Sequence, residues 1–281
     1  MCRVLHVSQG GFYTWLRRQD LPPAPREVAN RQLSDRIETV FRRSRGTYGS
    51  PRIHAELRAT GVECSRNRVA RLMRRAGIVA KRRKLHKVST TDSKHTYPVA
   101  PNLLNRQFSA ERPNEKWLTD ITYIPTKEGW LYLATVLDVC SRRVVGWAMD
   151  RHMDEGLVER ALQMAATHRQ PEEGVLHHSD RGSQYAAHNY QRLLNAHKMV
   201  CSMSRKGDCY DNAMMESFFS TLKSECATEP YNSRAEARLS IFEYIEVWYN
   251  RQRRHSALGY QSPEAFEQAH IRLFCDSTIS G

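Results

Sequence analysis

Residues 117–122 read WLTDIT, and they lie inside a segment, residues 116–124, that is rich in the residue types typical of β-strands. Because successive side chains of a strand point to opposite faces, Asp120 is expected on the face opposite Trp117 and Ile121. A carboxylate therefore stands on one face of an otherwise largely apolar strand.

Strand and helix patterns alternate after this first strand. Strands are predicted over residues 131–139 and 142–149, a helix over 155–168, a strand over 175–178, a helix over 183–195, a strand over 199–201, and helices over 212–226 and 235–249. This is the element order of a mixed sheet with helices on its faces. Ribonuclease H-like nucleases use the same order, so we predict an α/β core of that kind over residues 113–281, including a C-terminal helical extension.

Three carboxylates occupy positions that suit metal-dependent phosphoryl transfer. Asp120 lies within the first strand, Asp180 directly follows the fourth, and Glu216 lies in a helix. A carboxylate at the C-terminal end of a strand sits at the mouth of an open α/β sheet, where ligand sites usually lie. The first and fourth strands are neighbours in the predicted order, so the two aspartates can share a metal ion. Taken singly, each acidic residue is more readily explained as a cap, a turn residue or a salt-bridge partner.

The spacing of these residues favours one shared site. Thirty-five residues separate Asp180 from Glu216, and Lys223 follows Glu216 by seven residues. Seven residues are about two helical turns, so Glu216 and Lys223 share a helix face, and Lys223 is expected to meet a DNA phosphate. Carboxylate oxygens suit Mg²⁺ or Mn²⁺, and two such ions about 3.5–4 Å apart stabilise both the attacking and the leaving oxygen at phosphorus. Asp120, Asp180 and Glu216 are therefore the predicted ligands of two ions.

The sequence patterns in the first part of the chain predict helices and no strands. These helices are expected over residues 12–18, 27–43, 51–59 and 66–76, with Ser50 and Ser65 as caps of the last two. Two short helices joined by a Gly-containing turn are typical of a helix-turn-helix.

The second helix of that pair is rich in arginine. It carries Arg66, Arg68, Arg71, Arg74 and Arg75 and leaves Val69, Leu72 and Met73 for the core. In a DNA major groove, such guanidinium groups face phosphates and base edges. An ordinary helical hairpin with a charged outer face is the alternative.

The net positive charge of the chain comes entirely from its N-terminal part. Residues 1–112 hold 24 Lys and Arg against 8 Asp and Glu, a net charge of +16, whereas residues 113–281 hold 19 against 22, a net charge of −3. A basic arm on a near-neutral body favours a polyanionic partner over a merely solubilising surface.

The chain between the helices and the core is polar and basic. Residues 80–112 contain Pro98 and Pro101, and they open with a run of cationic residues, Lys81, Arg82, Arg83 and Lys84. We interpret this segment as a linker that follows a DNA backbone. The predicted organisation is thus a helical DNA-binding region over 1–79, a basic linker over 80–112 and a catalytic core over 113–281.

Other motifs in the chain resemble a known family. Asp120, Asp180, the 35-residue gap to Glu216 and Lys223 match the pattern of retroviral-integrase-like transposases. The further motifs are HSDRGSQY at 178–185, SRKGDCYDNA at 204–213, YNRQRRHSALGY at 249–260 and SPE at 262–264. Together they resemble the bacterial insertion-sequence transposases that are translated from two overlapping frames, the insertion sequence three family.

This resemblance implies a DNA transposase with a ribonuclease H-like core. Such an enzyme hydrolyses DNA at the ends of its element, using water, and then joins the freed 3′-hydroxyl to another phosphodiester. Asp120 and Asp180 would bridge two Mg²⁺ or Mn²⁺ ions, and Glu216 would complete the shell of one ion. No Ser, Tyr or Cys nucleophile is implied. The partners implied are double-stranded DNA (the terminal repeats and the target) and further copies of the chain on that DNA.

The start of the chain departs from a complete member of the family. Members with complete activity usually carry an additional helix-turn-helix and a zipper from the first frame, whereas residues 1–10 resemble the beginning of a second-frame product. A first-frame product is therefore a further expected partner.

Some residues near these motifs have competing explanations. One of His177 and His178 is expected to point into the sheet and the other to solvent. Asp138 and Asp211 are interpreted as turn or N-cap residues. Residues 249–254 predict either basic DNA contacts or a solvated helix end.

Composition excludes several classes of protein. Apolar residues make up 40% of the chain, which is enough for a core, and no run of about 18 apolar residues predicts a membrane span. The N-terminus lacks an apolar signal core, so we expect a cytoplasmic, nucleoid-associated protein. The seven cysteines show no CxxC spacing, which argues against a disulfide framework and structural zinc. A metal-dependent nuclease without joining, and a DNA-binding regulator with an inert core, are the alternatives to a transposase.

Overall fold

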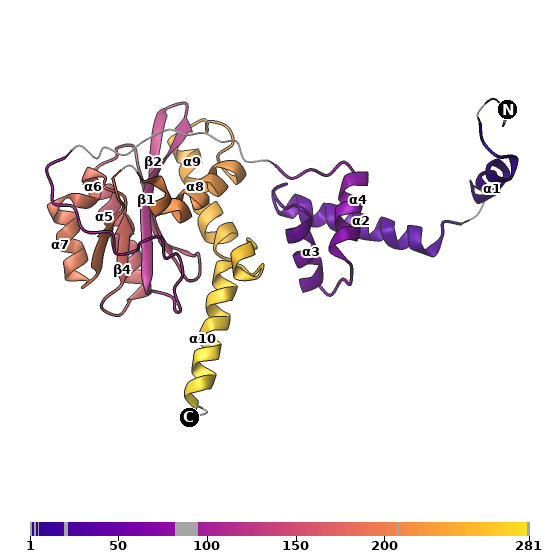
Figure 1. Cartoon of the computed structure of the whole chain (residues 1–281). Helices are drawn as coiled ribbons and strands as arrows, with labels where there is room; N and C mark the ends of the chain where they lie inside the picture. The colour runs from indigo at the N-terminus through magenta and orange to yellow at the C-terminus, as the bar shows by residue number, and fades with distance from the viewer. Residues whose placement is uncertain are drawn as a thin grey trace. The chain divides into compact units, whose positions relative to one another are not determined.

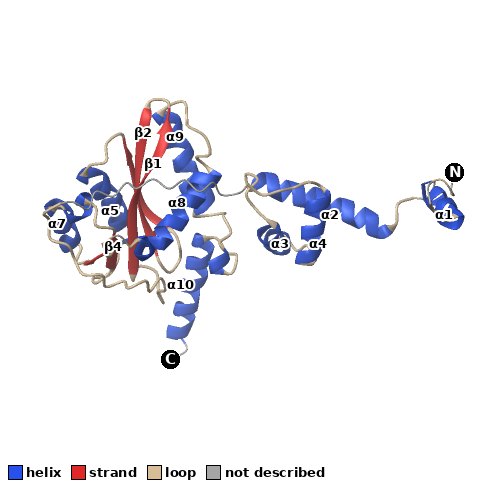
Figure 2. Ribbon diagram, turned by 45° about the horizontal axis from the view of Figure 1, so that its top comes forward, coloured by secondary structure: helices blue, strands red, loops and turns tan. Residues whose placement is uncertain are grey.

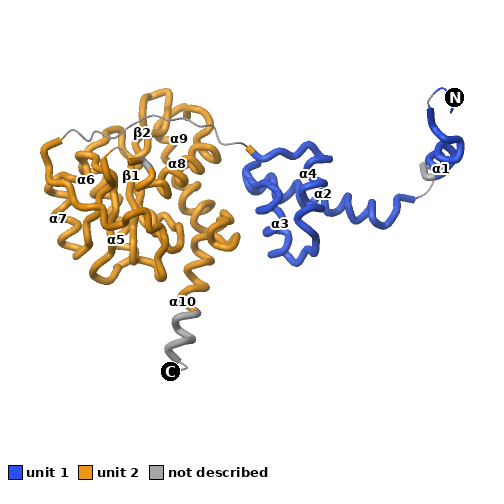
Figure 3. The backbone as a smooth tube through the Cα atoms, viewed as in Figure 1, with its two compact units in different colours: residues 1–80 blue, residues 81–281 orange. Residues whose placement is uncertain are grey.

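The computed structural model of this chain describes residues 6–19, 22–81, 95–206 and 208–279, together with Cys2 and Val4. Its contacts divide the chain into two compact units, residues 1–80 and residues 81–281 (Figure 3). Each unit buries apolar side chains of its own, Ile37 and Ile53 in the first and Trp117 and Leu162 in the second. No described helix is both long enough and apolar enough to cross a bilayer.

In the described part of the first unit, all regular secondary structure is α-helix. It comprises α1 (Gln9–Gln19), α2 (Pro25–Arg43), α3 (Ser50–Ala59) and α4 (Arg66–Arg75) (Figure 1). Helices α2, α3 and α4 pack against one another and bury Ile37, Ile53 and Val69 completely. The all-helical prediction for this region is confirmed.

Capping explains where two of these helices begin. The hydroxyl of Ser65 accepts a hydrogen bond from the backbone N–H of Arg68 at 3.2 Å, so Ser65 caps α4 as expected. The cap predicted at Ser50 is wrong by one residue, because Gly49 is the N-cap of α3 and Ser50 already belongs to the first turn. Pro51 in that first turn leaves no helical hydrogen bond unmade.

The second unit is built on a mixed five-stranded sheet with the order β3-β2-β1-β4-β5 (Figure 2). Its strands are β1 (Lys116–Thr126), β2 (Gly129–Asp138), β3 (Val144–Asp150), β4 (Leu176–Ser179) and β5 (Val200–Met203). The pairs β1–β2 and β2–β3 are antiparallel, and the pairs β1–β4 and β4–β5 are parallel. The predicted mixed sheet, with its first and fourth strands as neighbours, is confirmed.

Helices cover the sheet on both sides (Figures 1 and 2). On one side lie α5 (Glu155–Arg169), α6 (Ser183–Ala186) and α7 (His188–Ala196), and on the other α8 (Ala213–Glu225) and α9 (Arg234–Phe242). A Cβ atom at Gly146 of β3 would lie 2.3 Å from the carbonyl oxygen of Ala161 in α5. Glycine at this position therefore allows α5 to pack directly on the strand.

Three features of the helices differ from the sequence prediction. The single helix expected over 183–195 is two, because Ala187 adopts an extended conformation that separates α6 from α7. The helix expected over 235–249 ends as the π-helical segment η2 (Glu243–Tyr249), which turns Tyr244 and Tyr249 into the core. Beyond it lie η3 (Ser256–Leu258) and α10 (Pro263–Ile279), for which the predicted C-terminal helical extension gave no bounds.

Candidate active site

Asp120 and Asp180 come from neighbouring strands. In the parallel pairing of β1 with β4, Leu118 lies opposite His178, and each aspartate stands two residues beyond that pair. Both side chains line one small pocket, whose other lining residues are Ile121, Met153, Gly182, Gln184 and Tyr185. The structure thus brings the two aspartates together.

The backbone after β4 closes tightly around Asp180. The backbone N–H of Gly182 donates to Asp180 Oδ1 at 2.9 Å. A Cβ atom at position 182 would lie 3.1 Å from that same oxygen and 2.9 Å from Oε1 of Gln184. A side chain at position 182 would therefore push against the Asp180 carboxylate and the end of the Gln184 side chain.

The pocket places like charges close together. Burial raises the pKa of Asp120 well above its ordinary value, and the negative charges of Asp180 and Glu216 raise it further. The backbone N–H of Ile121, which donates to Asp120 Oδ1 at 2.8 Å, and the charge of Lys223 act in the opposite direction. Carboxylates that repel one another in this way are stabilised by a bound cation.

The aspartate pair suits a hard divalent ion, whereas Glu216 stands apart from it. Carboxylate oxygens are the ligands that Mg²⁺ and Mn²⁺ prefer. Glu216 is exposed on α8 and does not line the pocket. Within the described part of the chain, no three His, Cys, Asp or Glu side chains lie close enough together to hold a metal ion. Asp120 and Asp180 thus present two carboxylates to one pocket, and Glu216 does not complete a set of three with them in this structure.

Lys223 lies beside the site, against an aromatic ring. Its Nζ stands 4.1 Å from the ring centroid of Tyr123 on β1, a cation–π distance. Burial lowers the pKa of Lys223, and the charge of Asp120 partly offsets that shift. The Lys223 ammonium is thus held against the Tyr123 ring and within electrostatic reach of Asp120.

The expectation that one of His177 and His178 points to solvent is wrong, because helices cover both faces of the sheet. His177 is 1% exposed and its Nε2 lies 3.1 Å from the hydroxyl of Tyr190. His178 is fully buried, and its ring nitrogens lie 2.8 and 3.1 Å from the hydroxyls of Ser202 and Ser204. Burial lowers the pKa of His177 to about 3 and that of His178 to about 4, so both rings are neutral at pH 7.

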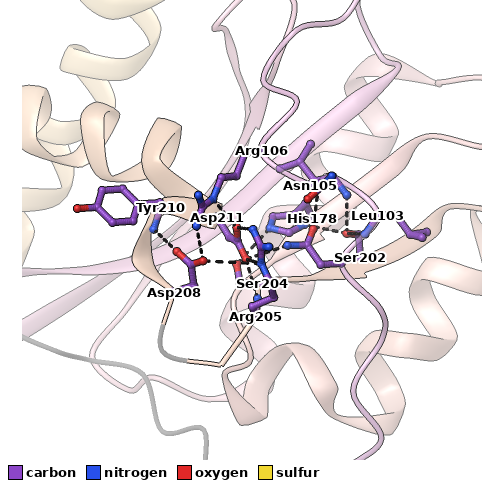
Figure 4. Close-up of polar contacts among 12 residues, drawn as sticks. Leu103, Asn105, Arg106, His178, Ser202, Ser204, Arg205, Asp208, Tyr210 and Asp211 are labelled. Atoms are coloured by element: carbon purple, nitrogen blue, oxygen red, sulfur yellow. Dashed lines mark hydrogen bonds and ion pairs between the residues drawn. The ribbon is translucent and has the colours of Figure 1, made fainter.

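Two further aspartates have different roles. Asp138 is a turn residue as predicted, since its carboxylate accepts from the backbone N–H groups of Asn114 and Ser141 at 2.6 and 2.9 Å. Asp211 is not an N-cap. The cap of η1 (Cys209–Asn212) is Asp208, and the Asp211 carboxylate is instead paired with arginines (Figure 4).

The basic residues of the N-terminal helices and linker that are predicted to bind DNA differ in exposure. Arg66, Arg71, Arg74, Arg75 and Lys81 are exposed. Arg68 is half-buried, and its Nε donates to Asn30 Oδ1 on α2 at 3.0 Å. Arg82, Arg83 and Lys84 lie outside the described residues.

The basic residues near the C-terminal motif are partly structural. Arg253 is 3% exposed, and its guanidinium donates to both oxygens of Glu225 at the end of α8, at 2.7–3.0 Å. Tyr244 and Trp248 also donate to Glu225 Oε2, at 3.0 and 3.3 Å. For Arg253, both explanations offered by the sequence, a DNA contact or a solvated helix end, are wrong, because its charge is buried and paired.

A DNA contact near the metals is one explanation that the sequence offers for Asn212, and the structure places this residue beside Thr119, the neighbour of the first aspartate. Its Nδ2 donates to the carbonyl oxygen of Thr119 at 3.4 Å, and its buried Oδ1 has no protein hydrogen-bond partner. The signal was its place, one helical turn before Glu216.

Comparisons with known proteins find relatives over almost the whole chain. A family described as integrase core domain matches residues 110–209, a second of the same description matches residues 197–263, and an HTH-like domain matches residues 27–86. Transposase InsF for insertion sequence IS3A of Escherichia coli is 46% identical over 96% of this chain and 94% of its own length. An uncharacterized 31 kDa protein of insertion element IS600 from Shigella sonnei is 44% identical over 97% of this chain and 99% of its own length.

Solved integrase cores are more distant. The HTLV-2 integrase catalytic core domain in complex with magnesium is 13% identical, with a TM-score of 0.43 over 56% of this chain and 97% of that one. The catalytic core domain of BIV integrase is 16% identical, with a TM-score of 0.41 over 57% of this chain and 99% of that one.

Proposed function

Because this chain belongs to the family of the insertion sequence IS3 transposases, we propose that it cuts the ends of its own element and joins them to target DNA. It is a DNA transposase with an integrase core of the DDE type. The observation that carries the proposal is the pocket that Asp120 and Asp180 line together.

The proposed division of labour follows from where the side chains lie. Asp120 and Asp180 would hold divalent ions, and Glu216, from α8, would complete the ligand set. Two Mg²⁺ or Mn²⁺ ions, when bound, neutralise charge at the scissile phosphate and lower the pKa of the attacking hydroxyl or water. Lys223, held over Tyr123, binds a phosphate beside the carboxylates. The attacking groups are water in the cut and the DNA 3′-hydroxyl in the joining step.

The helical unit is proposed to hold the DNA that the core cuts. The exposed arginines of α4 lie opposite the buried Val69, Leu72 and Met73, so they form a basic face that suits phosphates and base edges. Lys81 and the basic linker would continue that contact along the backbone. Pairing of two DNA ends requires further copies of the chain, and a first-frame product is a second proposed partner. An enzyme with these substrates would work on the bacterial nucleoid.

A joining assay tests the function. The purified chain is incubated with Mg²⁺ or Mn²⁺, labelled element-end DNA and a target plasmid, and the labelled products are separated by size. Joined products are expected from the wild type and none from Asp180→Ala. Cleavage without joining would contradict the transposase proposal, and joining by Asp180→Ala would contradict the assignment of the site.

A further inference from the structure

Asp211 lies in η1, the short turn that leads into the helix of Glu216, and it is a fully buried carboxylate with three partners. Arg205 donates to it from its backbone N–H at 2.8 Å and from Nε and Nη2 at 3.0 and 2.7 Å. Arg106 Nε donates at 3.2 Å, and Asn102 Nδ2 at 2.8 Å. One carboxylate thus ties the start of α8 to the end of β5 and to a segment more than 100 residues earlier in the chain (Figure 4).

That earlier segment, residues 102–106, is fixed to β5 at a second point. The backbone N–H groups of Leu103 and Leu104 donate to Ser202 Oγ at 2.9 and 3.3 Å, and Leu104 is 1% exposed. Ser202 also contacts the ring of His178, two residues before Asp180. The segment is therefore linked to the start of α8 through Asp211 and, through Ser202 and His178, to β4, the strand that precedes Asp180.

The donors around Asp211 leave it no capacity to act as a ligand itself. Both of its oxygens accept from guanidinium groups or an amide, and its side chain is closed to solvent. The hydrogen bond from Arg205 holds the pKa of the Asp211 carboxyl well below its usual range, so the ion pair persists at any working pH. Arg106 also pairs with Asp208, whose Oδ1 accepts from the backbone N–H of Tyr210 at 3.1 Å.

Helix α8 is thus held at both ends by buried charge. The last turn of α8 is fixed by the pair between Glu225 and Arg253. The turn η1, which leads into the first turn of α8, is fixed by the pairs of Asp211 with arginines. Glu216 lies five residues after Asp211 and nine before Glu225, and it stands outside the pocket of the two aspartates. Along the chain, the ion pair at the start of the helix is nearer to Glu216 than the pair at its end. A change at the start is therefore expected to displace Glu216 more.

We propose that Asp211 is a positioning residue for Glu216, and that Arg106 and Arg205 form with it a clamp that sets the start of α8 against β5. This proposal rests on the proposed function, because it takes Glu216 as the third carboxylate of the site. A displacement of about 1 Å in a reacting group costs on the order of a hundredfold in rate, so a loosened helix start is expected to cost that much.

Asp211→Asn tests the clamp, because it keeps the shape of the side chain and removes its charge. Joining is expected to fall by about a hundredfold. Hydrogen exchange should become faster in residues 208–219 and stay unchanged in β1 and β2. The rise in melting temperature that Mn²⁺ produces without DNA should shrink. The matched control is Glu173→Gln, which removes an exposed carboxylate paired with Lys198 in the same unit and should change none of these readings.

A second pair of variants keeps the test decisive if Asp211→Asn folds poorly. Arg106 is 47% exposed, so Arg106→Gln removes one donor of the clamp from the surface. It should lower joining about tenfold, and Arg106→Lys, which keeps the charge, should recover part of the loss. Faster hydrogen exchange should again be confined to residues 208–219.

The possible results separate this proposal from the function on which it rests. The positioning role alone would be overturned if the wild type joins DNA and the variants Asp211→Asn and Arg106→Gln show the same joining and the same hydrogen exchange as the wild type. Faster exchange spread evenly over β1, β2 and β3 would overturn it too, since that result indicates general loss of stability. A wild-type chain that never joins DNA would overturn the proposed function, and the role of Asp211 with it.

Discussion

The two units of this protein use charge in opposite ways. In the helical unit, four arginines of α4 are exposed and face solvent. In the core, charged groups are drawn inward, as Asp120 and Asp180 share a pocket while Asp211 and Glu225 are buried against arginines. Exposed charge gives contacts that salt weakens, whereas buried charge gives fixed geometry and metal affinity. The division suggests one unit that holds DNA and one that reacts with it.

The largest effect is expected when a buried charge of the pocket is neutralised. Asp120→Asn is expected to lower joining by a factor on the order of 10³, because an amide is a poor ligand for a hard cation. The melting temperature without metal should not fall, since the change removes a buried charge that Asp180 repels. Rates of joining and metal-free thermal unfolding check both parts.

Asp138→Asn is the control for that variant, because it alters another buried aspartate of the same sheet. Its carboxylate accepts from two backbone N–H groups, so this variant should lose stability instead. The contrast fails if the two variants behave alike.

The buried pair at the end of α8 should matter for stability. Glu225→Gln leaves the guanidinium of Arg253 buried without a counter-charge, so the free energy of unfolding should fall by about 3–5 kcal/mol. Urea unfolding at pH 7 measures this loss. The exposed pair of Lys198 and Glu173 provides the comparison, and Glu173→Gln should cost less than about 1 kcal/mol. Equal losses would mean that burial does not distinguish the two pairs.

The helical unit should respond to salt where the core does not. Arg71→Gln combined with Arg74→Gln removes two exposed charges from α4. The slope of log affinity against log salt concentration should fall by about 2, with about tenfold weaker binding at 0.1 M salt. Titrations of element-end DNA at several salt concentrations measure the slope. Arg160→Gln in the core is the control, and a slope that the α4 variant leaves unchanged would argue against this face.

The core should also lose stability at low pH through a buried histidine. The pKa of His177 is about 3 in the fold against an ordinary value of 6.5, so the unfolded chain binds a proton that the folded chain does not. The stability from neutral His177 is complete above pH 6.5 and is lost as the pH falls toward 3. The melting temperature should therefore drop over that range, and less steeply in His177→Phe. Parallel curves for the two proteins would contradict this explanation.

Sequence patterns predicted the sheet and the neighbouring aspartates because they depend on local periodicity and element order. The partners of Asp211 were missed, because Arg106 lies 105 residues away along the chain and local patterns carry no information about such contacts. His177 and His178 were misjudged because strand alternation alone does not reveal that helices cover both faces. The separation of Glu216 from the pocket depends on how α8 packs, which spacing along the chain does not determine.

The claim that one unit holds DNA and the other reacts with it is tested most directly by measuring DNA affinity and joining in the same variant, Asp180→Asn. Element-end DNA is titrated into the wild type and the variant, and joined products are then measured at saturating DNA in Mg²⁺ and in Mn²⁺. We predict unchanged affinity and a loss of joining on the order of 10³ in the variant. Joining at the wild-type rate would contradict the account, and so would a loss explained entirely by weaker DNA binding.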